Sequence, residues 1–269
     1  MLAIERYGDV TRLRMSTSVT RALGYEANAY LTRGMLVDTG FPAVAHDLAK
    51  WLDGARPTGV LVTHQHEDHA GNLELLVRGG VPVAASDATL AAIRDAAPLG
   101  LYRRVNWGTP PALRSPVVRF DPVGLRLVPT PGHTPDHHIV WDAERETIFS
   151  GDLFLSVKMR LAQDAEDVHG IVRSLRTVIA LAPKRVFCAH RGPLHDPVGT
   201  LRAKADWMEE ITGESRRLAA TGMSVPAITR RLLGRDGFTW IISRGKLSNR
   251  NLIRSALRTA GDQRLASPF

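Results

Sequence analysis

One short segment of the sequence concentrates four side chains of the kinds that bind metal ions. His64, His66, Asp68 and His69 follow directly after the apolar run Gly59–Thr63, which predicts a buried strand. Alternation at the end of a strand places His64 and His66 on one side, whereas Asp68 and His69 can turn toward a second position. Imidazole and carboxylate ligands suit zinc, and also iron or manganese. The spacing therefore predicts one ion at the first pair and another ion at the second.

A polar turn that is merely rich in histidine is the alternative interpretation of this segment. Each buried imidazole would then need a hydrogen-bond partner of its own, because an unsatisfied buried polar group costs free energy. Packing four such groups without a metal ion is therefore disfavoured.

Two ions need more ligands than one loop supplies, and the later sequence offers three candidates. His133, Asp152 and His190 each lie in a turn just past a predicted strand. Open α/β folds build their sites at the carboxyl ends of strands. Taken singly, a Gly-Asp or Gly-His in a turn is more often structural, so only the three residues together indicate further metal ligands.

The segments around these residues alternate between strand and helix, which favours a layered α/β architecture. Strands are predicted at Val10–Met15, Ala27–Thr32, Met35–Asp38, Gly59–Thr63, Val81–Ala84, Leu125–Val128, Ile139–Trp141, Thr147–Phe149 and Arg185–Cys188. Helices are predicted at Ala43–Leu52, Leu73–Val77, Ala88–Arg94, Asp167–Leu181, Val198–Leu218, Val225–Leu233 and Leu247–Thr259. The proline-rich stretch Ala97–Pro122 is predicted as a long loop.

Six short motifs resemble those of the metallo-β-lactamase-fold hydrolases, in the same order along the chain. They are Asn28–Leu31, Val37–Gly40, His64–His69, Pro131–Thr134, Phe149–Asp152 and Ala189–Pro193. The resemblance implies a four-layer αβ/βα sandwich with metal ions at the mouth between two sheets. A small C-terminal helical extension would follow, so we expect a catalytic domain over residues 1–197 and a basic helical domain over 198–269.

The same resemblance implies a ligand set for two divalent metal ions, in the first place zinc, with iron or manganese as alternatives. It assigns the first ion to His64, His66 and His133, the second to Asp68, His69 and His190, and a bridging role to Asp152. Asp38 would lie beneath the site and orient a ligand histidine. The two ions would lower the pKa of a shared water or hydroxide, and Asp68 would accept a hydrogen bond from it.

The carboxylate expected to bridge the two ions narrows the range of reactions that the chain could catalyse. Antibiotic-degrading branches of the superfamily lack a carboxylate at the position of Asp152, and the segment Pro131–His137 resembles the glyoxalase-II-like branch. The resemblance implies metal-dependent hydrolysis of an ester, thioester or lactone in a small-molecule substrate. The alternative is phosphodiester cleavage by an endoribonuclease of the same fold, whose helical C-terminal domain would bind RNA.

Three basic residues are candidate contacts to an anionic substrate. Arg191 follows His190 directly, where the family usually has glycine, and Lys158 and Arg160 follow Asp152 by a few residues. Ordinary surface charges and salt bridges are the alternative for all three.

The net charge of +8 is concentrated in the C-terminal part of the chain. Residues 200–269 hold 13 lysine and arginine residues against 6 acidic residues, which accounts for 7 of the 8 net charges. This surface can attract RNA, cap the site, form a homodimer, or be a solvated helical surface. We expect Trp240 to lie in the core rather than to serve as a stacking platform.

Composition and hydropathy indicate the cellular compartment in which the protein is expected. Apolar runs are shorter than a membrane helix requires, the N-terminal segment has no secretory pattern, and the single Cys188 excludes an intrachain disulfide. We therefore expect a cytoplasmic protein without membrane contact.

Overall fold

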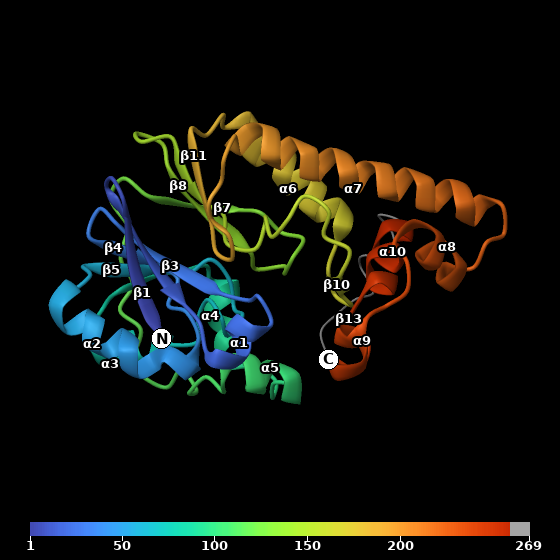
Figure 1. Cartoon of the computed structure of the whole chain (residues 1–269). Helices are drawn as coiled ribbons and strands as arrows, with labels where there is room; N and C mark the ends of the chain where they lie inside the picture. Colours follow the sequence, from blue (N-terminus) through green and yellow to red (C-terminus); the bar gives the residue numbers. More distant parts are fainter. Residues whose placement is uncertain (259–269) are drawn as a thin grey trace. The chain divides into compact units, whose positions relative to one another are not determined.

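The computed structural model describes residues 1–258 and divides into two compact units (Figure 1). Unit 1 comprises residues 1–129, 136–155 and 183–197, and unit 2 comprises residues 130–135, 156–182 and the chain from 198 onward. The end of the predicted helical domain, residues 259–269, lies outside the described residues. The expected separation into a catalytic and a basic helical domain stays a prediction.

The first sheet of unit 1 has six strands in chain order. They are β1 (Leu2–Tyr7), β2 (Val10–Met15), β3 (Ala27–Thr32), β4 (Met35–Val37), β5 (Gly59–Leu61) and β6 (Val83–Ala84). Strands β1 to β4 pair antiparallel, whereas β4, β5 and β6 run parallel. The sequences of β4 and β5 are apolar throughout because both faces of these strands are buried.

The second sheet of unit 1 has the strand order β12-β11-β9-β8-β7. Its strands are β7 (Arg126–Pro129), β8 (His138–Asp142), β9 (Thr147–Phe149), β11 (Arg185–Cys188) and β12 (Gly192–Pro193). Strands β9 and β11 run parallel, with Phe149 opposite Phe187. The residues that follow these two strands therefore leave the sheet at the same edge, and Asp152 and His190 lie in those segments.

Alternation along the strands of the first sheet separates two apolar clusters. In β4, Met35 and Val37 belong to a cluster that includes Val140, Phe149 and Phe187 of the second sheet, so it fills the space between the two sheets. Leu36 belongs to the other cluster, which packs against helices. The predicted α/β sandwich is therefore confirmed, with sheet facing sheet in unit 1.

The helices of unit 1 follow the strands as expected, with one correction. They are α1 (Ser18–Ala22), η1 (Pro42–Val44), α2 (Ala45–Ala55), α3 (Leu73–Arg78), α4 (Asp87–Arg94) and α5 (Leu101–Trp107). The prediction of a continuous loop over Ala97–Pro122 is wrong, because it contains α5. Two contacts stabilise α5: Trp107 packs on Phe41 with ring centroids 4.9 Å apart, and Arg103 pairs with Glu67.

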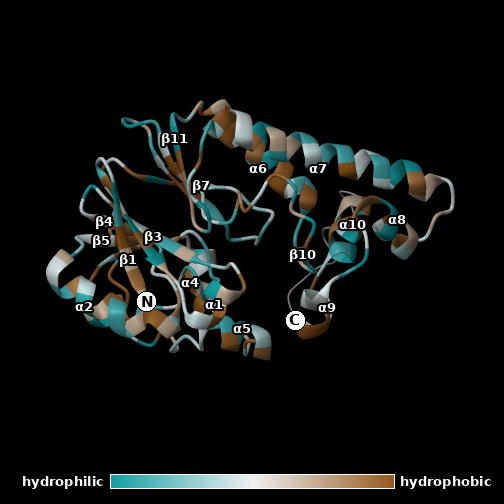
Figure 2. Ribbon diagram, viewed as in Figure 1, coloured by the Kyte–Doolittle hydropathy of each residue, from teal (hydrophilic) through white to brown (hydrophobic). Residues whose placement is uncertain are grey.

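Unit 2 is mainly helical. Its elements are β10 (Ala162–Gln163), α6 (Val168–Ala180), α7 (Pro197–Ala220), α8 (Val225–Leu232), α9 (Phe238–Ile242), β13 (Leu247–Ser248) and α10 (Asn249–Leu257). The first residue of α7, Pro197, belongs to unit 1, and the rest of the helix belongs to unit 2. Along α7, hydrophobic and hydrophilic residues alternate around the helix (Figure 2), and its buried residues include Leu201, Ala205 and Met208. The helix predicted over Leu247–Thr259 begins at Asn249 after the short strand β13; Thr259 lies outside the described residues.

Among the helices of residues 1–258, none combines the length and the apolar composition needed to cross a membrane.

A buried ion pair joins the two sheets of unit 1, and removing it tests how much this contact stabilises the fold. Arg33 donates from Nε and Nη2 to both carboxylate oxygens of Asp142, at 2.6 and 2.9 Å, and the Asp142 side chain is 1 % exposed. Burial would raise the pKa of Asp142, but hydrogen bonds from Arg33 and from the backbone of Arg145 hold it below its usual value of 3.8.

We expect Arg33→Met to lower the free energy of unfolding at pH 7 by about 1.5–3 kcal/mol, because it leaves a buried carboxylate without its guanidinium. The folded-state pKa of Asp142 is lowered, so this contribution is complete above pH 3.8 and is lost as the pH falls through the folded-state pKa. Urea unfolding between pH 7 and pH 3 measures it. The control Glu144→Gln removes an exposed partner of the same arginine and should cost about 0.5 kcal/mol or less. A pH-independent loss in Arg33→Met would contradict this account.

Candidate metal centre

The segment of residues 64–69 folds into a tight loop after β5. The backbone amides of His69 and Ala70 both donate to the carbonyl of His66, so the loop ends in a helical turn. His64 and His69 are almost fully buried, and Asp68 is 8 % exposed. The strand end thus directs its ligand-type side chains inward rather than into solvent.

The first donor group contains the two histidines of the strand end. Nε2 of His64 lies 3.1 Å from Nδ1 of His66, and a carboxylate oxygen of Asp152 lies within 4.8 Å of both. Two nitrogens bound to one tetrahedral zinc ion at 2.0–2.1 Å would be about 3.3 Å apart. The spacing of the two imidazole nitrogens therefore fits two ligands of a single ion.

The second donor group contains Asp68, His69 and His190. Oδ2 of Asp68 lies 3.9 Å from Nε2 of His69 and 3.5 Å from Nε2 of His190. Oδ1 of Asp152 lies 3.2 Å from the same atom of His69 and 2.9 Å from that of His190. The carboxylate of Asp152 is therefore next to both donor groups.

Asp38 holds two of these histidines in the tautomer that a metal ion needs. Its carboxylate accepts hydrogen bonds from the amide and the hydroxyl of Thr63 at 2.8 and 2.9 Å, and from Nδ1 of His69 at 2.7 Å. The Thr63 hydroxyl donates its proton to Asp38, so at 3.0 Å it can only accept from Nδ1 of His64. Both imidazoles then carry their proton on Nδ1, which leaves the lone pair of Nε2 for a metal ion.

The other ring nitrogen of His190 is held in the same way by the backbone. Nδ1 of His190 donates to the carbonyl of Glu26, which immediately precedes β3. The backbone amide of Asn28 donates in turn to the carbonyl of Ala189 at 2.7 Å. The turn after β11 is therefore tied to β3, and Nε2 of His190 is aimed at the carboxylates.

The electrostatics of the site favour a cation. Burial and the neighbouring imidazoles hold the pKa of His64 well below 6.5. Burial would also lower the pKa of His69, but attraction to the carboxylates of Asp152, Asp38 and Asp68 outweighs it and raises that pKa well above 6.5. Burial would lower the pKa of His190 as well, but attraction to the carboxylates of Asp152 and Asp68 outweighs burial and raises it. Buried carboxylates beside imidazole nitrogens form a donor set that fits a divalent metal ion.

His133, the seventh predicted ligand, belongs to unit 2. Its Nδ1 lies 2.8 Å from Oε1 of Glu166, so the imidazole is oriented by a carboxylate, as His69 is by Asp38. Glu166 is itself held by the last helix: the hydroxyl of Ser255 in α10 donates to the Glu166 carbonyl at 2.6 Å and accepts from the amide of Val168 at 2.9 Å. The basic C-terminal segment therefore positions a residue that orients His133.

Several residues of the site were not identified from the sequence. Nε2 of His137 accepts a hydrogen bond from the amide of Asp152 at 3.0 Å. Gly151 precedes Asp152 at φ +48°, and a Cβ there would lie 2.7 Å from Nε2 of His137, so the turn requires glycine. The histidine-rich segment 133–138 hinted at His137, whereas nothing in the sequence connects Glu166 or the carbonyl of Glu26 to a distant histidine.

The candidate substrate contacts are exposed residues. Arg191 donates from Nε to the carbonyl of Leu155 at 3.0 Å in unit 1, whereas Lys158 and Arg160 belong to unit 2. A role in anion binding stays a prediction for all three.

Asp38→Asn tests how far orientation of the imidazoles supports metal binding. Asp38 has φ +60°, a conformation that asparagine tolerates better than other side chains, so the backbone should be retained. We expect metal affinity to fall by about 10–100-fold, because the amide no longer holds Nδ1 of His69 and the Thr63 hydroxyl together. Competition with a chromogenic chelator measures the affinity, and thermal unfolding checks the fold. Unchanged affinity in a folded variant would contradict the role of Asp38.

Comparisons with known proteins agree with this fold. A family model described as the metallo-beta-lactamase superfamily matches residues 25–190. The beta-lactamase-like protein 2 homolog of Drosophila melanogaster is 28 % identical over 207 residues, which is 70 % of this chain and 69 % of the relative. The human hydroxyacylglutathione hydrolase-like protein is 32 % identical over 189 residues, 63 % of this chain and 60 % of the relative.

A solved structure extends the match beyond the family model. The metallo-beta-lactamase family protein from Thermus thermophilus superposes with a TM-score of 0.64 at 18 % identity, covering 93 % of this chain and 91 % of that chain. Other curated relatives are matched over only about half of their own length. The family match over most of the sandwich, together with the histidine and aspartate groups, shows that the chain belongs to the metallo-beta-lactamase superfamily and is a metal-dependent hydrolase.

Proposed function

We propose that this hydrolase uses two divalent metal ions to cleave an ester, thioester or lactone. The observation that carries the proposal is the position of Asp152, whose carboxylate is next to both donor groups. A carboxylate that bridges two metal ions has to lie next to the other ligands of both ions. His64 and His66 would hold the first ion, and Asp68, His69 and His190 the second.

We assign His133 to the first ion as its third histidine. Both ends of its loop are fixed in the second sheet, because Pro129 of β7 pairs with His138 of β8. Glu166 holds its Nδ1, which leaves Nε2 as the ligand atom. With Asp152 shared, each ion would have four protein ligands, and substrate or water would add to these.

The protein residues have distinct roles in the proposed reaction. When bound, the ions supply Lewis acidity and lower the pKa of a coordinated water toward neutrality. Asp68 accepts a hydrogen bond from the attacking water and so orients it toward the carbonyl carbon. Asp38, Glu166 and the carbonyl of Glu26 keep three imidazoles from rotating during the reaction. Zinc is our first choice of metal, with iron or manganese as alternatives.

Two observations bear on the bond that is cleaved. The name of the human relative, hydroxyacylglutathione hydrolase-like protein, supports carbonyl chemistry in this chain. The concentration of positive charge after residue 198 favours the alternative, phosphodiester cleavage of RNA. Arg191, Lys158 and Arg160 would contact an anionic group of either substrate. A homodimer and a cytoplasmic location stay predictions.

Ser255→Ala tests the assignment of His133. Removing the hydroxyl leaves the Glu166 carbonyl and the Val168 amide without their common partner, so Glu166 should hold His133 less precisely. We expect metal affinity to fall by up to about 10-fold, below the loss for a residue that touches the ligand directly. Ser243→Ala is the matched control, because Ser243 is also buried in unit 2 and has no hydrogen bond to this group. Equal metal affinity in the two variants would contradict the assignment.

Turnover on two matched chromogenic panels tests the reaction. One panel contains esters, thioesters and lactones, and the other contains phosphodiesters. We expect metal-dependent activity on the carbonyl panel, and a loss of at least about tenfold in Asp152→Asn, because the amide is a poorer bridging ligand. Asp206→Asn, which changes an exposed aspartate of unit 2, should leave activity unchanged. Activity confined to the phosphodiesters would establish the alternative, and full activity of Asp152→Asn would remove its bridging role.

A further inference from the structure

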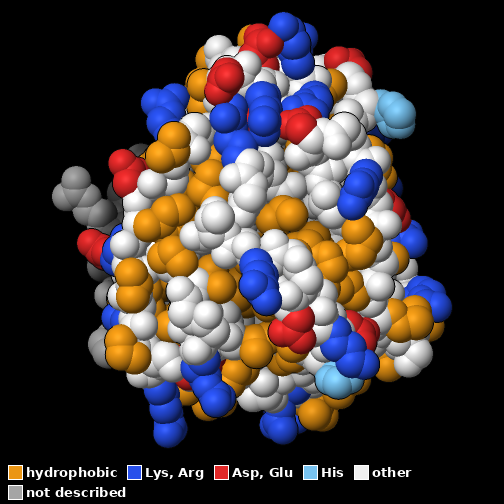
Figure 3. All heavy atoms as spheres, turned by 90° about the vertical axis from the view of Figure 1, so that its left-hand side faces the viewer, with side chains coloured by type: hydrophobic (Ala, Val, Ile, Leu, Met, Phe, Trp, Pro, Cys, Tyr) orange, Lys and Arg blue, Asp and Glu red, His pale blue; other side chains and the backbone are white. Residues whose placement is uncertain are grey.

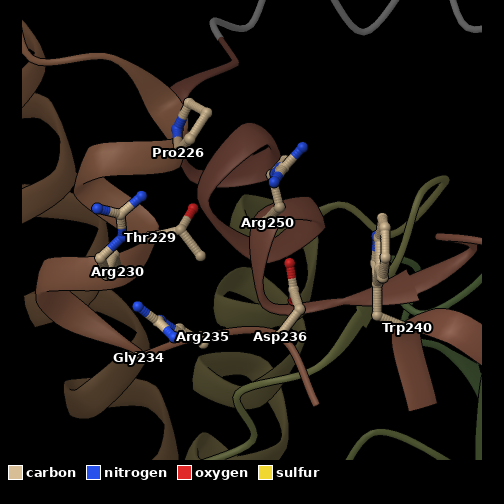
Figure 4. Close-up of a pocket in the computed structure, with 8 residues that line it drawn as sticks. All are labelled: Pro226, Thr229, Arg230, Gly234, Arg235, Asp236, Trp240 and Arg250. Atoms are coloured by element: carbon tan, nitrogen blue, oxygen red, sulfur yellow. The ribbon is translucent and has the colours of Figure 1, made fainter. Parts of the chain in front are cut away.

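A second candidate binding site lies entirely within unit 2. It is a pocket of about 320 Å³ lined by Pro226, Thr229, Arg230, Gly234, Arg235, Asp236, Trp240 and Arg250 (Figure 4). Its volume is at the lower end of the range typical of small-molecule sites. The lining residues come from α8, from the loop before α9, from α9 and from the first turn of α10.

Three arginines make this pocket strongly basic. Arg230, Arg235 and Arg250 form no ion pair with any other residue in the described part of the chain, and Nε of Arg250 is buried without a hydrogen bond there. The surface in Figure 3 is different, since several of its lysine and arginine side chains lie beside acidic ones. Three guanidinium groups without an ion-pair partner among residues 1–258 offer more donors than a carboxylate can accept, and they suit the oxygens of a phosphate.

The opposite side of the pocket is an aromatic surface. Trp240 is 42 % exposed, so the expectation that it lies in the core is wrong. In Figure 4 the indole lies across the pocket from Arg230 and Arg235, and the side chains of Arg250 and Asp236 lie between these arginines and the indole. The amide of Gly245 donates to the Trp240 carbonyl at 2.8 Å, and a Cβ at Gly245 would lie 3.3 Å from the indole Nε1. The chain therefore turns tightly after α9, and the backbone of Gly245 lies beside the indole.

Hydrogen bonds also hold together the segments that line the pocket. Asn249, at the start of α10, donates from its backbone amide to Oδ1 of Asp236 at 2.7 Å. Its side-chain amide donates to the carbonyls of Leu233 and Arg235 at 3.3 and 3.4 Å. The loop that carries Arg235 is thus fastened to the helix that carries Arg250, which lowers the entropic cost of binding.

We infer that this pocket binds a nucleoside phosphate, with the phosphate against the arginines and the base stacked on Trp240. An indole beside guanidinium groups is the combination that recognises a base and its phosphate in single-stranded nucleic acids. The nucleotide could be free or part of an RNA strand. None of the residues that line the pocket is among the proposed metal ligands.

Calorimetric titration of the full-length Asp152→Asn protein at 0.15 M salt tests the inference. The probes are adenosine 5′-monophosphate, ribose 5-phosphate and a short single-stranded RNA, which the impaired enzyme should leave intact. We expect the nucleotide to bind at least about fivefold more tightly than ribose 5-phosphate, the difference being base stacking. Tighter binding of the RNA than of the nucleotide would support the inference with an RNA strand as the source. Tighter binding of the nucleotide would support it with a free nucleotide.

Variants in the same background locate the binding. Trp240→Ala should weaken nucleotide binding at least about fivefold, and Trp240→Phe should retain most of it. Arg250→Gln and the exposed Arg230→Gln should each weaken it about tenfold. Arg231→Gln removes an exposed charge of α8 that does not line the pocket and is the matched control. The inference is overturned if no probe binds, if ribose 5-phosphate binds as well as the nucleotide, or if the control weakens binding as much as Arg250→Gln.

Discussion

The structure of the site depends on buried negative charge placed against imidazole lone pairs. Asp38, Asp68 and Asp152 are all at least nine-tenths buried, and each lies within 4 Å of a nitrogen of His69. Such a concentration of carboxylates is unfavourable unless cations compensate it. Attraction to these carboxylates raises the pKa of His69, so a positive charge is favoured at this point. A divalent ion would provide that charge and would also accept the lone pairs of the histidines.

The fold supplies this arrangement by converging strand ends. The loop of residues 64–69 follows β5 of the first sheet, and Asp152 and His190 follow the parallel strands β9 and β11 of the second. Since apolar side chains of both sheets form one cluster between them, the two sets of strand ends are held together by the core. A second set of contacts then orients the imidazoles, and these contacts come from Asp38, the Glu26 carbonyl and, for His133, from Glu166.

The ligand-type residues were predictable because they lie in short motifs at the ends of apolar strands. The layered α/β architecture was predictable because apolar strand segments alternate with helical ones, whereas the sandwich was expected only from the resemblance to the metallo-β-lactamase fold. The contacts of Glu26 and Glu166 were not predictable, since each joins residues more than 30 positions apart and a single glutamate carries no local signal. Helix α5 was missed because prolines surround it, while its stability comes from Phe41 and Glu67. Trp240 was misassigned because composition does not distinguish a core indole from one that lines a pocket.

Metal content tests most directly whether these carboxylates and imidazoles bind two ions. The purified, metal-replete chain should contain about two divalent ions, measured by inductively coupled plasma mass spectrometry against protein concentration. In Asp152→Asn the content should fall after dialysis against the same buffer, because both proposed ions share this carboxylate. A folded, metal-replete chain that holds no ion would contradict the account, and one ion per chain would contradict the bridging role of Asp152.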